Sequence, residues 1–181
     1  MSDTSELTSY AEQFDQEAAN GEQDDRLERL LVILSKGSME DAYAALVMAN
    51  GAVMEGIETH MFFTFFGLDA ITKDKQDKLH MPTVGNPALM RNVPTMVAGL
   101  PGMEALATKM MRGKMEEHDV PPVSEFLDMI VAGGGSLHGC DLAVEMFDLE
   151  PEDLIDEVED IITVGEMLEL AGGERSQVIF V

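Results

Sequence analysis

The chain has 181 residues, of which 45% are hydrophobic, so it is long enough for one domain with an apolar core and is not wholly disordered. It carries 35 acidic and 11 basic residues, a formal net charge of −24, which repels phosphate backbones and argues against a general nucleic-acid binder. The single cysteine excludes an intrachain disulfide and a multi-cysteine zinc site.

The acidity has two interpretations. Acidic residues are spread along most of the chain and lysines are few, a pattern typical of a halophilic, salt-adapted protein, where screening shortens the range of charge repulsion. The alternative is an acidic face that docks a basic partner. We favour salt adaptation.

The first 25 residues hold eight acidic residues and no basic residue, which is unlike a signal peptide. The longest charge-free apolar stretches are too short to span a bilayer. We therefore expect a cytoplasmic protein without stable membrane insertion. We also expect residues 1–25 to be an acidic flexible tail and residues 26–181 to be the folded domain.

The folded part begins with a strand, a helix and a second strand. The apolar run Arg29–Leu34 is typical of a strand buried on both faces of a parallel sheet. Ser38 and Asp41 have the S-x-x-D spacing of a capping box and open a helix over Met39–Glu55. A second strand is predicted over Glu58–Phe66, which completes a right-handed βαβ unit.

The rest of the chain alternates helices and strands. Residues 67–102 are irregular, with a short helix over Pro87–Gly99 broken at Pro94. Further helices are predicted over Met103–His118, Ser124–Ala132, Leu142–Phe147, from Pro151, and over Thr163–Leu170, and strands over Ser136–Gly139 and Gln177–Val181. Val158–Ile162 fits either a strand or the end of a helix. The pattern predicts a single α/β domain with four or five mostly parallel strands and helices on both faces.

Three turns should meet at one edge of this sheet, because ligands of parallel sheets bind at the carboxyl ends of the strands. The turns are Ser35–Ser38, Phe65–Leu68 and Leu137–Asp141. The third holds Cys140, where backbone N–H groups and a helix dipole favour a thiolate, and His138 can add positive charge. Asp141 opposes a second negative charge nearby. A reactive thiol and an inert buried thiol both remain open.

A second candidate site is the turn Lys36, Gly37 and Ser38, which can bind an anion at the start of a helix. The alternative is that Ser38 only caps the helix. The chain lacks the G-x-G-x-x-G and G-x-x-x-x-G-K-[ST] motifs, so we expect no nucleotide cofactor.

A metal site is not expected. His138 and Cys140 provide two ligands at most, and a structural zinc site needs four. The other histidines lie in distant segments of the chain, at His60, His80 and His118.

Methionine is concentrated between residues 81 and 115, which hold seven of the 15 in the chain. They are Met81, Met90, Met96, Met103, Met110, Met111 and Met115. Methionine is an adaptable core residue, so ordinary packing is one interpretation, and a subunit interface or mobile cover over the cysteine is another. Pro94 and Pro101 break any long amphipathic helix and disfavour membrane docking.

Four segments, LVILSKGSMEDAYAALVMANGAVMEG, FFTFFGL, PGMEALATKMM and GCDLAVEMFDL, follow one another over roughly residues 29–181. In this order they resemble the DsrE/DsrF-like sulfur-relay family, in the branch often labelled "peroxiredoxin family". The resemblance implies a flavodoxin-like subunit that forms homo-oligomers. It also implies sulfur carried as a persulfide on one cysteine, here Cys140, and passed to partners such as TusA-like sulfur carriers. A peroxidase cycle with a resolving cysteine is not expected, because the chain has no second cysteine.

The leading hypothesis is a sulfur carrier of sulfurtransferase-like chemistry, with Cys140 holding sulfane sulfur and His138 assisting proton movements. The alternative is a non-catalytic oligomeric binding or regulatory protein in which Cys140 is structural. A third hypothesis is that Cys140 is a redox-sensing thiol. The sulfur hypothesis requires an accessible thiol, whereas the binding hypothesis requires only a pocket.

Overall fold

The computed structural model describes residues 26–82 and 102–181. The flexible tail expected over residues 1–25 and the broken helix expected over residues 87–99 lie outside the described residues.

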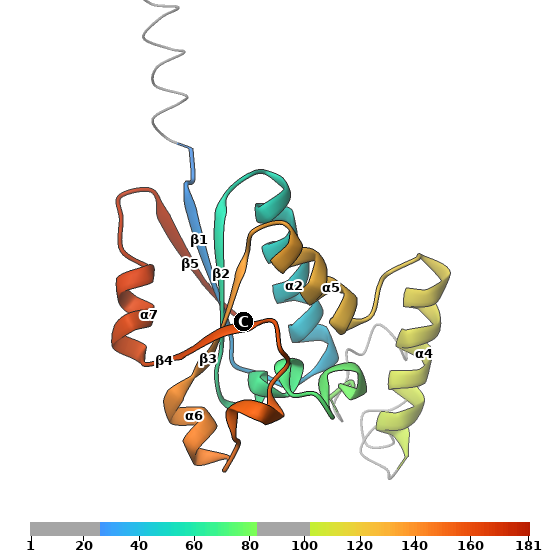
Figure 1. Cartoon of the computed structure of the whole chain (residues 1–181). Helices are drawn as coiled ribbons and strands as arrows, with labels where there is room; N and C mark the ends of the chain where they lie inside the picture. The colour runs from blue at the N-terminus through green and yellow to red at the C-terminus, as the bar shows by residue number, and fades with distance from the viewer. Residues whose placement is uncertain (1–25, 83–101) are drawn as a thin grey trace, which may run out of the picture.

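In the described part of the chain, five strands form one sheet in the order β4-β3-β2-β1-β5 (Figure 1). The strands are β1 (Arg29–Leu34), β2 (Glu58–Phe63), β3 (Ser136–Cys140), β4 (Val158–Ile162) and β5 (Ser176–Phe180). Every neighbouring pair is parallel. The predicted α/β fold with a parallel sheet is confirmed, and the first three strands lie side by side.

The centre of the sheet is the centre of the core. β1 is buried from Leu30 to Leu34 and β2 from Thr59 to Phe63, because each strand has a neighbour on both sides. The edge strands β4 and β5 leave most of their side chains partly or fully exposed. Burial therefore falls from the middle of the sheet toward both edges.

Helices lie on both sides of the sheet (Figure 1). On one side, α2 (Met39–Met54) packs against β1, β2 and α5 (Val123–Ala132). On the other side lie α6 (Asp141–Met146) and α7 (Val164–Leu170), and α4 (Met103–Glu117) lies at the periphery beyond α5. Among the described residues, no helix is long and apolar enough to cross a membrane.

Side chains cap two of these helices. The Ser38 hydroxyl accepts the N–H of Asp41 at 3.2 Å, so the predicted start of α2 is confirmed. At α7, Thr163 accepts the N–H of Glu166, and the Glu166 carboxylate accepts the N–H of Thr163 at 2.8 Å. This reciprocal capping box fixes the first turn of a helix of seven residues.

Tertiary contacts change two predicted elements. The second strand ends at Phe63 rather than Phe66, because the N–H of Thr64 donates to the carbonyl of Leu34 and a 3₁₀ helix, η1 (Phe65–Ile71), follows. The helix expected from Pro151 is a single 3₁₀ turn, η3 (Pro151–Asp153).

The chain after η3 turns away from helical geometry because Leu154 bridges to Thr72 and the N–H of Ile155 donates to the carbonyl of Ile71. Val158–Ile162, which fitted two kinds of element, is the edge strand β4.

Candidate functional site

Two turns pack tightly at the carboxyl edge of the sheet, one after β1 and one after β2. A Cβ atom added at Gly37 would lie 2.7 Å from the carbonyl oxygen of Phe66, and one added at Gly67 would lie 2.1 Å from that of Leu34. Glycine is therefore required at both positions, since backbone atoms of the neighbouring turn occupy the space. The next strand, β3, ends at the same edge, with Gly139 opposite Phe63.

Cys140 is the last residue of β3 and the N-cap of α6, as the sequence predicted. It pairs with Ile162 of β4, and only 3% of its surface is exposed. The thiol is free of any disulfide. Sulfur chemistry with another protein would therefore require a local movement that exposes it.

His138 lies two residues before Cys140 on β3, so both side chains point to the same face of the sheet. The His138 ring is buried, and its Nε2 lies 3.1 Å from Nδ1 of His60. The two ring planes are nearly parallel, 26° apart. His60 therefore belongs to the surroundings of His138, although the two residues are far apart in the sequence.

The hydrogen bonds continue from His60 to the amino end of the sheet. Nε2 of His60 lies 3.1 Å from Oε1 of Glu58, and Nη2 of Arg29 donates to Oε2 of Glu58 at 2.8 Å. Nη1 of Arg29 donates to the carbonyls of Leu170 and Gly172 at the end of α7, both at 3.1 Å. These bonds place the end of α7 over this face of the sheet.

Burial and charge move two pKa values in this row. The Arg29 guanidinium, and after it the His60 ring, lower the pKa of the Glu58 carboxyl through hydrogen bonds. Burial, and after it the neighbouring His60 ring, lowers the pKa of His138, although Glu159 and Asp160 of β4 act in the opposite direction. Glu58 is therefore a carboxylate and His138 a neutral imidazole at neutral pH.

Sequence reasoning missed His60 and Glu58 as neighbours of His138. A signal was present, because Glu58 and His60 alternate on one strand and His138 and Cys140 alternate on another. This signal can be used only when it is known that the two strands are adjacent and in which register they pair. No group of three metal-binding side chains occurs within residues 26–82 and 102–181.

The turn Lys36, Gly37 and Ser38 lines an open pocket of about 990 Å³. Its polar groups are engaged: the Ser38 hydroxyl donates to Asp41 at 2.5 Å, and Nζ of Lys36 also lies on Asp41, at 3.2 Å. Lys75 in the same pocket pairs with Asp69 at 2.6 Å. An anion would have to displace these carboxylates, so the pocket favours a cationic or neutral ligand over an anionic one.

The methionine-rich segment contributes to both core and surface. Met81 is fully buried, whereas Met110 of α4 is exposed, and residues 90 and 96 lie outside the described part of the chain. α4 lies on the α2 and α5 side of the sheet, away from the face that carries the Cys140 side chain (Figure 1). The helix α4 therefore does not cover the cysteine.

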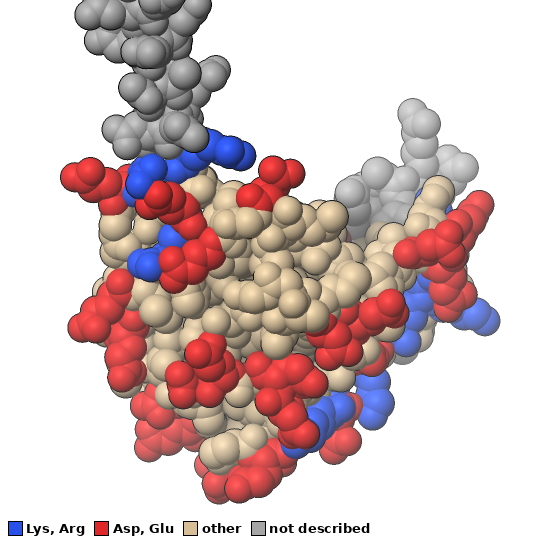
Figure 2. Space-filling model, turned by 45° about the horizontal axis from the view of Figure 1, so that its top comes forward, with Lys and Arg blue, Asp and Glu red and all other residues tan. Residues whose placement is uncertain are grey.

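Charge on the surface is predominantly negative. Figure 2 shows groups of Asp and Glu side chains around a broad uncharged area of the visible face, with fewer Lys and Arg side chains gathered in a few places, one of them where the described chain begins. Charge density of this kind supports either interpretation of the acidity given by the sequence.

Comparison with known proteins places the chain in a family. Residues 26–179 match the model of the DsrE/DsrF/DrsH-like family. The chain is 31% identical over 137 residues to the sulfur carrier protein DsrE2 of Allochromatium vinosum, covering 72% of this chain and 85% of that protein. It is 23% identical over 138 residues to the uncharacterised protein YrkE of Bacillus subtilis, covering 75% and 86%.

A solved structure supports the fold. The protein of unknown function MTH1491 from Methanobacterium thermoautotrophicum superposes with a TM-score of 0.52 at 9% identity, over 84% of this chain and 98% of that one. The sequence matches cover most of the domain, and the parallel sheet with helices on both sides is consistent with them. The chain belongs to the DsrE/DsrF/DrsH-like family.

Proposed function

We propose that this protein is a sulfur carrier that holds sulfane sulfur as a persulfide on Cys140 and passes it to a thiol of a partner protein. The observation that carries the proposal is the placement of the only cysteine of the chain at the carboxyl edge of the sheet, where β3 passes into α6. The 31% identity to a protein named as a sulfur carrier supports it.

The chemistry is thiol exchange. The Cys140 thiolate attacks the outer sulfur of a donor R–S–SH, the donor S–S bond breaks, and R–S⁻ leaves with its electron pair. The product Cys140–S–SH then gives its outer sulfur to an acceptor thiolate by the same reaction. No metal or redox cofactor is required, since sulfur is transferred and neither protein is oxidised.

Partner docking has an exposed apolar surface available next to Cys140. The 3₁₀ helix η1 contacts both β3 and α6. Exposed apolar side chains on and after these two helices are Phe65, Phe66, Leu142, Met146 and Phe147. Phe65 has a φ of +46°, a conformation that non-glycine residues rarely adopt and that is often retained where function requires it. We assign this surface to the docking of a TusA-like sulfur carrier. We also assign the protein to the cytoplasm, because the thiols of both proteins must stay reduced.

Assembly into a homo-oligomer stays a prediction. A second group of exposed apolar side chains lies on α7 and on the edge strand β5, namely Val164, Leu168, Val178 and Phe180. Such an edge can be covered by another copy of the chain. Light scattering at high salt tests the prediction, and a stable monomer would contradict it.

The alternative function rests on one observation, the 3% exposure of Cys140. A thiol this buried suits a non-catalytic oligomeric binding or regulatory protein in which Cys140 only packs. The two functions differ in whether folded protein can take up sulfur.

Intact-mass spectrometry after incubation with polysulfide tests the proposal. Wild type should gain sulfur that dithiothreitol removes, and Cys140→Ser should gain none. The dithiothreitol step is essential because the chain has 15 methionines, and two methionine oxidations add nearly the mass of one sulfur but do not reverse with dithiothreitol. Loaded protein mixed with a TusA-like carrier should then pass the sulfur on. Uptake by wild type only in urea would favour the structural role.

A further inference from the structure

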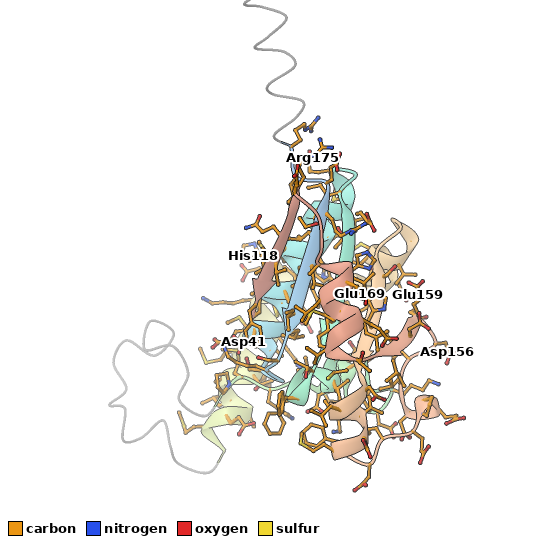
Figure 3. The ribbon with its side chains drawn as sticks, turned by 90° about the vertical axis from the view of Figure 1, so that its left-hand side faces the viewer. Asp41, His118, Asp156, Glu159, Glu169 and Arg175 are labelled. Atoms are coloured by element: carbon orange, nitrogen blue, oxygen red, sulfur yellow. The ribbon has the colours of Figure 1, made fainter. Side chains whose placement is uncertain are left out.

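A row of polar side chains crosses the sheet face over which α7 lies, from the amino ends of β1 and β2 toward Cys140. Figure 3 looks toward this side, with α7 in front and Arg175 marking the amino end of β5. We call this row the polar chain, and its members are Arg29, Glu58, His60 and His138. All four share one face because side chains alternate along each strand and Arg29 lies directly opposite Glu58.

The donors and acceptors of the polar chain follow from its two charged members. A guanidinium only donates hydrogen bonds and a carboxylate only accepts them. Glu58 therefore accepts from Arg29 at one oxygen and from Nε2–H of His60 at the other. A neutral imidazole carries one ring hydrogen, and in His60 this hydrogen lies on Nε2, which donates to Glu58. Nδ1 of His60 is then the acceptor of the hydrogen bond between the two rings.

The same reasoning extends to His138. With Nδ1 of His60 as acceptor, Nε2 of His138 carries the hydrogen between the two rings. The His138 ring is 4% exposed, and its Nδ1 has no hydrogen-bond partner within the described part of the chain. A buried nitrogen that is left unpaired is uncommon in native structures, and a catalytic role is one of the explanations for it.

We propose that the polar chain holds His138 in the tautomer with an unprotonated Nδ1, so that this nitrogen takes the proton of Cys140 during sulfur loading. His138 and Cys140 occupy successive positions on the same face of β3, so their Cα atoms are about 6.6 Å apart along the strand. Arg29, Glu58 and His60 are positioning residues in this scheme. The inference rests on the proposed function of Cys140.

The proton balance is complete within the site and the donor. The Cys140 S–H bond breaks and an N–H bond forms at Nδ1 of His138 as the thiolate attacks the outer sulfur of R–S–SH. The proton then passes to the leaving R–S⁻, which departs as R–SH. The charged and titratable groups around His138 are His60 on β2 and Glu159 and Asp160 on β4, and the two carboxylates favour the transient imidazolium.

Glu58→Gln is the decisive variant, because it keeps the shape and removes the charge. Arg29 would hold the amide oxygen, which turns the amide N–H₂ toward His60. His60 would then accept at Nε2 and donate from Nδ1, so the hydrogen on His138 would move to its Nδ1. The matched control is Glu28→Gln, which breaks a comparable exposed ion pair with Arg175 at the same edge, the two glutamates being 60% and 50% exposed.

Nitrogen NMR of the imidazole rings reads the tautomers directly, and His138→Gln identifies the signal among the four histidines of the chain. Wild type and Glu28→Gln should show an unprotonated Nδ1 on His138, and Glu58→Gln a protonated one. A protonated Nδ1 in wild type, or no change in Glu58→Gln, would overturn the proposal.

The rate of Cys140 alkylation by iodoacetamide supplies the chemical readout, since it needs a thiolate but no sulfur donor. At neutral pH, Glu58→Gln should react about tenfold more slowly than wild type or Glu28→Gln. A general base that acts directly contributes about 10²–10⁴-fold to a rate, and the effect of Glu58 should be smaller because Glu58 acts through two imidazole rings. Equal rates would make the polar chain merely structural. Failure of wild type to form a persulfide, with both readouts as expected, would instead reject the proposed function alone.

Discussion

The close contact between the turns after β1 and β2 can be tested at Gly67. An alanine there would place its Cβ 2.1 Å from the carbonyl oxygen and 2.7 Å from the carbonyl carbon of Leu34. Both are backbone atoms of a buried strand end, so no side chain can rotate away. The same oxygen accepts the N–H of Thr64 at 3.0 Å, and separating the turns would weaken that bond as well.

The expected cost of Gly67→Ala combines two effects. Overpacking in a dense core costs about 1–3 kcal/mol, and a weakened backbone hydrogen bond adds about 1 kcal/mol. The free energy of unfolding should fall by about 2–4 kcal/mol, which for a chain of this size lowers Tm by roughly 5–15 °C. The matched control is Gly51→Ala in α2, where nothing lies within 4 Å of the added Cβ. It should stabilise the protein by about 0.5–1 kcal/mol, since alanine favours a helix interior over glycine.

Urea denaturation followed by circular dichroism at fixed high salt measures both variants. The midpoint should fall for Gly67→Ala and rise slightly for Gly51→Ala, with an unchanged slope against urea concentration. If Gly67→Ala were as stable as wild type, the two turns would not pack as described, and the carboxyl edge would lack the rigidity that positions the site.

Three further predictions concern pH and salt. The pKa of His138 in the folded protein lies below its ordinary value of 6.5, so the unfolded chain binds the proton at a higher pH than the folded protein does. The free energy of unfolding should therefore fall as the pH falls below about 6.5, by up to about 1.4 kcal/mol per pH unit. Denaturation midpoints from pH 7 to 5 should fall less steeply for His138→Gln, and equal slopes would contradict the assignment. At a net charge of −24, stability should fall as KCl decreases from 1 M to 0.01 M, where the screening length grows from about 3 to 30 Å. Alkylation of Cys140 by neutral iodoacetamide should quicken with added salt, whereas a rate that only falls would indicate a structural thiol.

Local sequence patterns were sufficient for the central elements of the fold. The run Leu30–Leu34 is continuously apolar because β1 is buried on both faces, and Ser38 marks the start of α2 because its hydroxyl caps that helix. The edge strand β4, Val158–Ile162, has two acidic residues among its five, since only one of its sides is paired. Its composition fits solvent-exposed structure of either kind, so the sequence alone left it undecided.

The end of β2 could not be predicted from its own residues. The second half of Glu58–Phe66 is mostly aromatic, and nothing within it marks Phe63 as the last residue of the strand. The stop is imposed by Leu34, whose carbonyl binds Thr64 and leaves room only for glycine at position 67. The site divides in the same way. The position of Cys140 at a strand-to-helix junction is local, whereas the pairing of His60 with His138 spans 78 residues and depends on strand order and register.

Burial of Cys140 restricts how the thiol can meet a partner. β1 and β2 are held on both sides and carry several of the largest fully buried side chains, so their separation would unfold the core. β4 pairs only with β3, and the register of that pair shifts between Leu137 and His138, an irregularity that weakens the ladder beside the site. α6 has six residues, too few to be stable without its contacts. An opening that exposes Cys140 at low cost must therefore involve β4 or α6. Stabilising β4 or α6 should slow alkylation of Cys140, whereas stabilising α2 on the opposite face should not.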